Sequence, residues 1–302
     1  MGGFEVGVIL LTGQTGEPRV TQRWSDLLGM ARLSEELGFD TVWVPDELLW
    51  RPAGKDQMGM WDGLSMAAAL AASTSRVKIG TWVVSALHRN PGITAKIAET
   101  IDEISGGRFV FGLGAGHAGP GQATAFGLPE DHIFGRFEEA LEIIVPLLRT
   151  GHADFDGRYH TARNLDEVPQ GPRPNRIPLM LGVLGEKGFR LAAKHADIWS
   201  SYATERVDML EFGPRLATFE AACLEVGRDP ETVGRSAGVD IRPAQSQPDP
   251  DGKTIAGSVS QMADAILALR DGGFDHVELW PDPFQRSTIE ALGPVLERVR
   301  AG

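Results

Sequence analysis

Three side chains capable of acid–base chemistry, His117, Asp46 and Glu47, each follow an apolar segment that reads as a strand. An imidazole titrates near neutral pH, and a carboxylate can serve as an acid or a base, so these groups can move protons. Simpler roles remain open: His117 can merely line a wall, and the two carboxylates can form a solvated acidic rim or pair with Arg51. His88 lies near the end of a neighbouring strand and is a weaker candidate of the same kind.

A glycine motif at Gly114, Gly116 and Gly119 fits the Gly-x-Gly-x-x-Gly pattern of dinucleotide-binding proteins and follows an apolar strand. The context of that pattern is missing, because the next periodic helix is expected only at about residue 136, too far away to place a phosphate on its first turn. A nicotinamide site is therefore not expected. These glycines, with Ala115 between them, instead favour close approach of a flat ring to the backbone.

A second glycine-rich turn, residues 182–188 (GVLGEKG), runs from a strand into a helix. Free backbone amides at such a turn can hold a phosphate. Lys187 favours an anion there, whereas the carboxylate of Glu186 opposes one. A tight turn without a ligand is the alternative.

The elements that must position these groups alternate between strands and helices. In residues 77–117, two apolar runs flank a segment in which Ile93, Ile97 and Ile101 share one helical face, opened by Asn90-Pro91 and closed by glycines. Two parallel strands joined by a crossover helix place their carboxyl ends side by side. Since α/β proteins bind ligands at that face, we expect the site there.

The whole chain, 1–302, is expected to be one domain. The excursion at 150–177, with a small hairpin, falls between strands four and five. Eight strands alternating with eight helices predict a closed (β/α)8 barrel, with an open doubly wound sheet as the alternative. A repeated Gly-Phe-Asp before strands two and eight favours the barrel. The strands are expected at about 4–11, 41–44, 77–84, 108–117, 178–182, 197–200, 236–241 and 276–279.

Composition narrows the function classes. With 29 basic and 41 acidic residues the net charge is -12, which argues against nucleic acid or an anionic membrane as a partner. The single cysteine, Cys223, excludes an internal disulfide, and the start of the chain resembles no leader, so a cytoplasmic location is expected. No cluster of metal ligands and no lysine follows a strand, which disfavours metal hydrolases and Schiff-base aldolases.

The sequence resembles the luciferase-like monooxygenase superfamily, whose barrel enzymes use reduced FMN or the deazaflavin F420. The resemblance covers nearly the whole chain and implies a two-electron cofactor lying across the barrel mouth. Departures from the family pattern are Glu47, where histidine is usual, and Val183-Leu184, where Gly-Ser is common. The segments that carry the resemblance are 37–46 (LGFDTVWVPD), 74–81 (TSRVKIGT), 89–91 (RNP), 105–108 (SGGR), 112–116 (GLGAG), 192–197 (AAKHAD) and 227–230 (GRDP).

The resemblance also implies roles for individual residues. Trp82-Val83 matches a bulge with a non-prolyl cis peptide that supports the cofactor's central ring, and residues 182–186 match the loop that receives its phosphate. Proton handling is implied for His117, Glu47 and Asp46. The implied cofactor-binding residues are Thr81, Trp82, Val83, Gly114, Ala115, Gly116, Gly182, Val183, Leu184, Gly185, Glu186 and Trp199.

The expected function is hydride transfer between reduced F420 and a small organic substrate. One alternative is an FMNH2-dependent monooxygenase, which needs oxygen and a separate flavin reductase. Another is a non-catalytic flavin-binding barrel, motivated by the departures at Glu47 and Leu184. Because members of this superfamily are often dimers, a homodimer is a further expectation.

Overall fold

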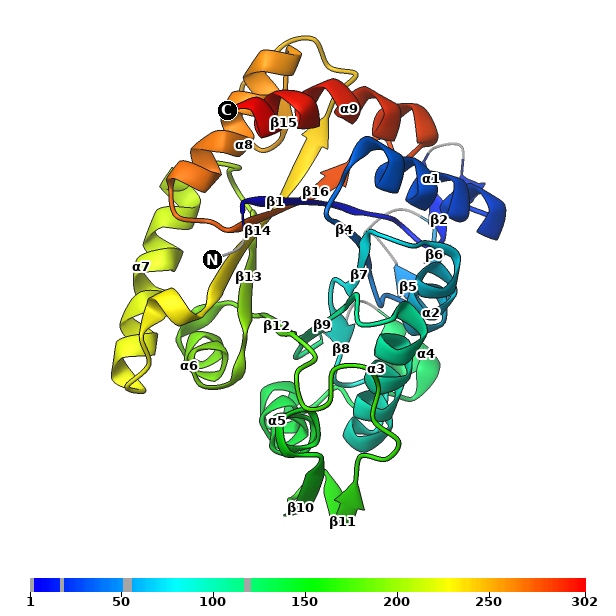
Figure 1. Cartoon of the computed structure of the whole chain (residues 1–302), viewed down its shortest axis with the longest axis vertical. Helices are drawn as coiled ribbons and strands as arrows, with labels where there is room; N and C mark the ends of the chain where they lie inside the picture. Colours follow the sequence, from blue (N-terminus) through cyan, green and yellow to red (C-terminus); the bar gives the residue numbers. More distant parts are fainter. Residues whose placement is uncertain (1–2, 17–18, 51–55, 117–120) are drawn as a thin grey trace.

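The computed structural model describes residues 3–16, 19–50, 56–116 and 121–302. Within these residues eight parallel strands form a ring (Figure 1). Successive strands pair with each other, and the last pairs with the first, so the sheet closes. The predicted (β/α)8 barrel is confirmed, and the open sheet is excluded. The barrel strands are β1 (Glu5–Ile9), β4 (Thr41–Val44), β7 (Lys78–Thr81), β9 (Phe109–Gly114), β12 (Leu179–Gly182), β13 (Ile198–Tyr202), β14 (Gly234–Arg242) and β16 (His276–Pro281).

Helices surround this ring on the outside (Figure 1). Their ends follow the signals in the sequence: the side chain of Asn90 accepts hydrogen bonds from the amides of Gly92 and Ile93, Pro91 occupies the first turn, and Gly106 ends the helix at φ 63°. The surrounding helices are α1 (Trp24–Leu37), α2 (Gly63–Ser73), α3 (Pro91–Ser105), α5 (Ile133–Thr150), α6 (Gly185–His195), α7 (Met209–Glu225), α8 (Val259–Asp271) and α9 (Arg286–Ala301).

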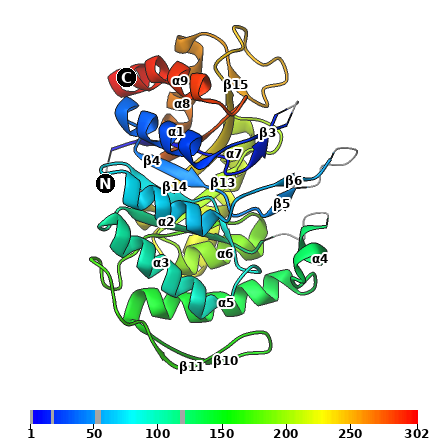
Figure 2. The same ribbon diagram turned by 90° about the vertical axis from the view of Figure 1, so that its right-hand side faces the viewer.

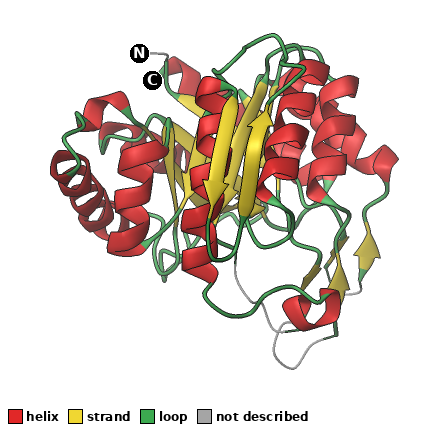
Figure 3. Ribbon diagram, turned by 90° about the horizontal axis from the view of Figure 1, so that it is seen from below, coloured by secondary structure: helices red, strands yellow, loops and turns green. Residues whose placement is uncertain are grey.

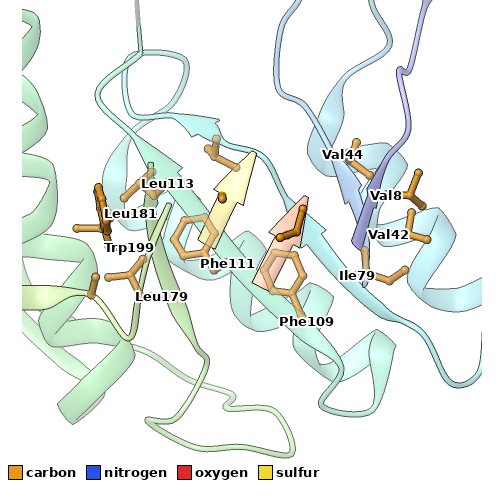
Figure 4. Close-up of a cluster of buried hydrophobic side chains, with 14 of the residues drawn as sticks. Val8, Val42, Val44, Ile79, Phe109, Phe111, Leu113, Leu179, Leu181 and Trp199 are labelled. Atoms are coloured by element: carbon orange, nitrogen blue, oxygen red, sulfur yellow. The ribbon is translucent and has the colours of Figure 1, made fainter. Parts of the chain in front are cut away.

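The main core lies between the strands and the helices, where side chains such as Val42, Phe111 and Leu181 are fully buried (Figure 4). A second, smaller cluster contains Trp43 and Met180, the strand neighbours of those residues, which alternation places inside the barrel. A methyl group on Gly80 would lie 2.1 Å from the Trp43 ring, so a glycine is needed there to admit the indole.

The two Gly-Phe-Asp segments make equivalent hydrogen bonds at the rim of the barrel opposite the predicted site. The Asp40 carboxylate accepts a hydrogen bond of 2.7 Å from the amide of Val6, and the Asp275 carboxylate accepts one of 2.9 Å from the amide of Arg235. Each aspartate therefore ties the start of its strand to a neighbouring strand.

The excursion before β12 contains the predicted hairpin, β10 (His152–Asp156) with β11 (Thr161–Asp166). Figures 2 and 3 place further short elements together beyond one end of the barrel. These are β2 (Gln14–Thr15) with β3 (Val20–Thr21), β5 (Leu49–Trp50) with β6 (Met58–Gly59), and α4 (Gln122–Phe126). The expectation of no helix before residue 136 was therefore wrong: α4 intervenes, and α5 begins at Ile133. No helix in the described ranges is long and apolar enough to cross a bilayer.

Candidate active site

A bulge at Trp82 and Val83 interrupts the third barrel strand. Gly80 of β7 pairs with Val110 of β9, and pairing resumes in β8 (Val84–Ser85), where Val84 pairs with Leu113. Gly80 and Val84 are four residues apart, whereas their partners Val110 and Leu113 are three apart. The third barrel strand therefore contains one extra residue at this point. The Trp82-Val83 peptide is cis. The bulge and the cis peptide implied by the family resemblance are both present.

Neighbouring strands are shaped to receive the bulge. The Thr81 hydroxyl donates to the carbonyl of Gly112 (2.8 Å) and accepts from its amide (2.9 Å), replacing strand pairing beside the bulge. A methyl group on Gly114 would lie 2.8 Å from a methyl carbon of Val83, and one on Gly182 would lie 3.0 Å from the other. Val83 therefore fits only because β9, the adjacent strand, and β12, the strand beyond it, carry glycine at its level.

Trp82 is fixed by a hydrogen bond across the barrel interior. Its indole nitrogen donates to the Glu278 carboxylate at 2.8 Å, and the Ser200 hydroxyl donates to the same carboxylate at 3.0 Å. The ring makes edge-on contacts with Tyr202 and Trp280, at centroid distances of 5.4 and 5.7 Å. The position of this indole is therefore set by one acid and two aromatic rings.

Glu278 is completely buried, in the middle of β16. Burial raises the pKa of its carboxyl group above the ordinary glutamate value, although hydrogen bonds from Trp82 and Ser200 act in the opposite direction. An acid at such a position in an apolar strand was visible in the sequence, but nothing in the sequence indicated its partner.

Asp46 follows β4 and is buried, with its carboxylate engaged on both oxygens. Arg89 binds it through two hydrogen bonds, of 2.7 and 3.0 Å, and the Ser85 amide donates a third at 3.2 Å. Arg89 also contacts Asp62, the residue that caps α2. Asp46 thus joins the end of β4 to the segment after the bulge. Its partner is Arg89; Arg51, the partner weighed from the sequence, lies outside the described residues.

His88 extends this network. The side-chain oxygen of Gln122 accepts hydrogen bonds of 2.8 Å from the backbone amides of Leu48 and Leu49. Its side-chain nitrogen is therefore turned toward Nε2 of His88, at 3.3 Å. Nε2 must therefore accept, and Nδ1 donates to Asp46 at 3.1 Å. Both nitrogens of the imidazole are therefore engaged.

A cavity of about 540 Å³ opens above the bulge at the carboxyl ends of the strands. Its walls are mostly apolar, with a few polar groups, as is typical of sites for planar ligands. Eleven of the residues singled out in the sequence lie on its wall: Asp46, Glu47, Trp82, Val83, His88, Gly114, Ala115, Gly116, Gly182, Val183 and Leu184.

Other expected site residues lie elsewhere. Thr81 is buried behind the wall, and Trp199 stacks on Phe219 in the outer core, where its indole donates to the Val183 carbonyl at 3.1 Å. Neither residue lines the cavity, and the direct cofactor contact expected of both stays a prediction. His117 lies outside the described residues.

The cavity extends to the start of α6. Leu184 is the residue before this helix, and its side chain makes no capping hydrogen bond. Gly185 adopts φ 78° with open space around it, and Glu186 lies exposed in the first turn. The first amides of a helix lack intrahelical partners and favour an anion, so this end of the cavity can hold a phosphate.

A second cavity of about 770 Å³ adjoins the first and shares Pro45, Glu47, Trp82, Tyr202 and Trp280 with it. The Tyr202 hydroxyl donates to the Asp240 carboxylate at 3.0 Å. Burial raises the pKa of both groups, and the neighbouring Asp240 raises that of Tyr202 further. This pair was not singled out in the sequence. Among the described residues there is no group of three or more potential metal ligands.

The fold and this site define a class of protein. The family model for luciferase-like monooxygenases matches residues 4–249. The chain therefore belongs to the luciferase-like monooxygenase family.

Relatives in this family include a reductase, a dehydrogenase and a monooxygenase. The chain is 31% identical over 175 residues to 5,10-methylenetetrahydromethanopterin reductase of Archaeoglobus fulgidus, covering 58% of this chain and 48% of the relative. It is 29% identical over 248 residues to F420-dependent glucose-6-phosphate dehydrogenase of Nocardia farcinica (80% and 69%). It is 34% identical over 178 residues to pyrimidine monooxygenase RutA of Cronobacter sakazakii (56% and 51%). The matched segment thus spans about half the length of the first and third of these relatives.

Solved structures share the fold at lower identity. An F420-dependent secondary alcohol dehydrogenase in complex with an F420-acetone adduct superposes with a TM-score of 0.82 at 20% identity, covering 99% of this chain and 100% of that one. A riboflavin lyase with modified FMN and riboflavin gives a TM-score of 0.82 at 17% identity, covering 99% and 92%. These similarities support the barrel architecture.

Proposed function

We propose that this protein is an oxidoreductase that binds F420 in the cavity above Trp82 and Val83 and transfers a hydride between it and a small organic substrate in the adjoining cavity. The observation that carries the proposal is the cavity itself, which runs from the bulge, flanked by Gly114 and Gly182, to the uncapped start of α6.

The residues present fit such a cofactor. The glycines beside Val83 leave the backbone accessible to a flat ring, and the apolar wall suits its faces. The amides at Gly185 and Glu186 suit its phosphate, although the Glu186 carboxylate weakens the attraction. When bound, reduced F420 supplies the hydride.

The chain's own residues hold the reacting groups and handle protons. Glu278 and Ser200 orient Trp82, while Arg89 holds Asp46 and hence the end of β4. Glu47 lies on the wall of both cavities, so in this proposal it exchanges a proton with the substrate. His117, from the family resemblance, remains a proposed second proton-handling residue. Asp46 is assigned a positioning role, because its oxygens are already engaged.

We favour F420 over FMN because, of the three relatives described above, the one matched over the largest share of this chain is named as F420-dependent. The alternative, an FMN-dependent monooxygenase supplied by a separate flavin reductase, is supported by the 34% identity to pyrimidine monooxygenase RutA. One relative is named for a sugar phosphate, but we do not propose that substrate for this protein. None of the described residues lining either cavity is lysine or arginine, so no cationic side chain faces a phosphate there.

The test is turnover of reduced F420 under anaerobic conditions with a panel of carbonyl and imine acceptors, beside reduced FMN under air with a flavin reductase. Oxidation of reduced F420 that depends on the acceptor and not on oxygen supports the proposal. Activity that requires FMN and oxygen establishes the monooxygenase instead, and binding without turnover of either cofactor indicates a non-catalytic barrel.

A further inference from the structure

The second cavity has its own walls and floor. It lies over the carboxyl ends of β1, β14 and β16, beneath the β2–β3 and β5–β6 hairpins that Figure 2 shows beyond one end of the barrel. It meets the first cavity at Trp82, Tyr202 and Trp280. A ligand here would therefore lie directly beside the proposed position of the cofactor ring.

Aromatic rings and thioethers form a large part of the walls of this cavity, beside polar groups such as Gln14, Gln22 and Gln285. Trp82, Trp280 and Tyr202 contribute from the barrel strands, and Trp50 and Met58 from the β5–β6 hairpin. Such walls favour a flat apolar body, and the faces of tryptophan and tyrosine also attract a cation.

One carboxylate, Asp240, faces this apolar space. Its hydrogen-bonding partner is the Tyr202 hydroxyl, and among the described residues it forms no ion pair. The nearby Arg242 is already bound to Asp282, with its nitrogen 2.7 Å from the carboxylate. Burial raises the pKa of Asp240, as expected for a carboxylate that lacks a bound cation.

The remaining charges on the wall have the same sign. Glu47 and Asp282 also line the cavity, Asp282 paired with Arg242, and none of the described lining residues is lysine, arginine or histidine. An anionic ligand would thus meet like charges in a partly desolvated space, whereas a cation would supply the counter-charge that Asp240 lacks.

We propose that this cavity binds a flat organic molecule that carries a protonated amine or basic ring nitrogen, with the nitrogen donating a hydrogen bond to Asp240 and the apolar body packed among Trp82, Trp280 and Trp50. The identification of this bound molecule as the substrate rests on the proposed function. The binding preference itself follows from the cavity alone.

The test uses three probes of one shape: 1-naphthylmethylamine, 1-naphthylmethanol and 1-naphthoate, titrated calorimetrically into the whole protein at neutral pH. A charge-assisted hydrogen bond predicts that the amine binds about tenfold or more tightly than the alcohol, with the acid weakest. Asp240→Asn should abolish the preference. Tyr202→Phe, which removes the hydroxyl and keeps the carboxylate, should retain it.

Equal binding of amine and alcohol to the wild type would overturn the inference, as would an amine preference that survives in Asp240→Asn. Thermal unfolding and F420 binding, measured on each variant, verify that it is folded. F420 binding also separates the two proposals: amine preference without binding of F420 or FMN refutes the proposed function alone, and cofactor binding without amine preference refutes this inference alone.

Discussion

The indole nitrogen of Trp82 lies 2.8 Å from the carboxylate of Glu278, so the first residue of the bulge is anchored to the opposite side of the barrel interior. This contact couples an acid with a raised pKa to the wall of the proposed cofactor cavity. It also gives the buried Glu278 carboxylate a hydrogen-bonding partner inside the barrel.

Replacing Glu278 by glutamine should change how stability depends on pH. Because the folded pKa is raised, the stabilisation is complete below the ordinary glutamate pKa and is lost as pH rises through the folded value. Over that window the wild type should lose up to about 1.4 kcal/mol per pH unit relative to Glu278→Gln. Urea unfolding of both proteins across the window measures this; parallel curves would contradict the raised pKa.

Gly238→Ala should displace Trp82. The added methyl group would lie 2.5 Å from the Trp82 ring and 3.1 Å from that of Tyr202. We expect a loss of about 1–3 kcal/mol in the free energy of unfolding and weaker cofactor binding. Gly234→Ala is the matched control on the same strand, because its methyl group would meet Ile198 at 3.4 Å, an ordinary contact. Equal effects of the two substitutions would argue against a special role for the Trp82 contact.

Arg89→Met should be strongly destabilising. Asp46, one of its partners, has a side chain only 1% exposed, and loss of the guanidinium leaves that carboxylate without a cation. Removing one member of a buried pair costs about 3–5 kcal/mol. Arg190→Met, which breaks an exposed pair with Glu225, should cost less than about 1 kcal/mol. Chemical denaturation compares the two, and the double variant Asp46→Asn/Arg89→Met should recover part of the loss.

Glu186→Gln should tighten binding of a phosphate-bearing cofactor. The carboxylate lies in the first turn of α6, where it opposes an anion at the helix start. Its removal should lower the dissociation constant of F420 about two- to fivefold at low ionic strength. The deazaflavin nucleoside without its phosphate is the control and should bind both proteins equally. A similar gain for both ligands would place the phosphate elsewhere.

Local signals in the sequence were sufficient to predict the barrel fold. The strand Thr41–Val44 and the helix Pro91–Ser105 have the predicted ends, because Asn90, Pro91 and Gly106 act on the backbone next to them. The short helix Gln122–Phe126 was missed, since a five-residue helix between glycines has no measurable periodicity.

The site was predictable only in outline. Sequence position places Asp46 and Glu47 at the cavity, because a strand end fixes where the next residues lie. The partners of Asp46 and Trp82 are distant in the sequence, Arg89 in the segment before α3 and Glu278 on β16, and long-range contacts of this kind leave no spacing pattern in the sequence. Trp199, although on the expected strand, faces the outer core, because side chains alternate along a strand and the next one, Ser200, faces the barrel interior.

Equilibrium binding of F420 and of FMN to the purified protein, each measured by fluorescence quenching, tests the proposed cofactor site most directly. We expect micromolar or tighter binding of F420, weaker binding of FMN, and weakened F420 binding in Gly238→Ala but not in Gly234→Ala. Tighter binding of FMN would favour the monooxygenase, and failure to bind either cofactor would contradict a cofactor site above Trp82 and Val83.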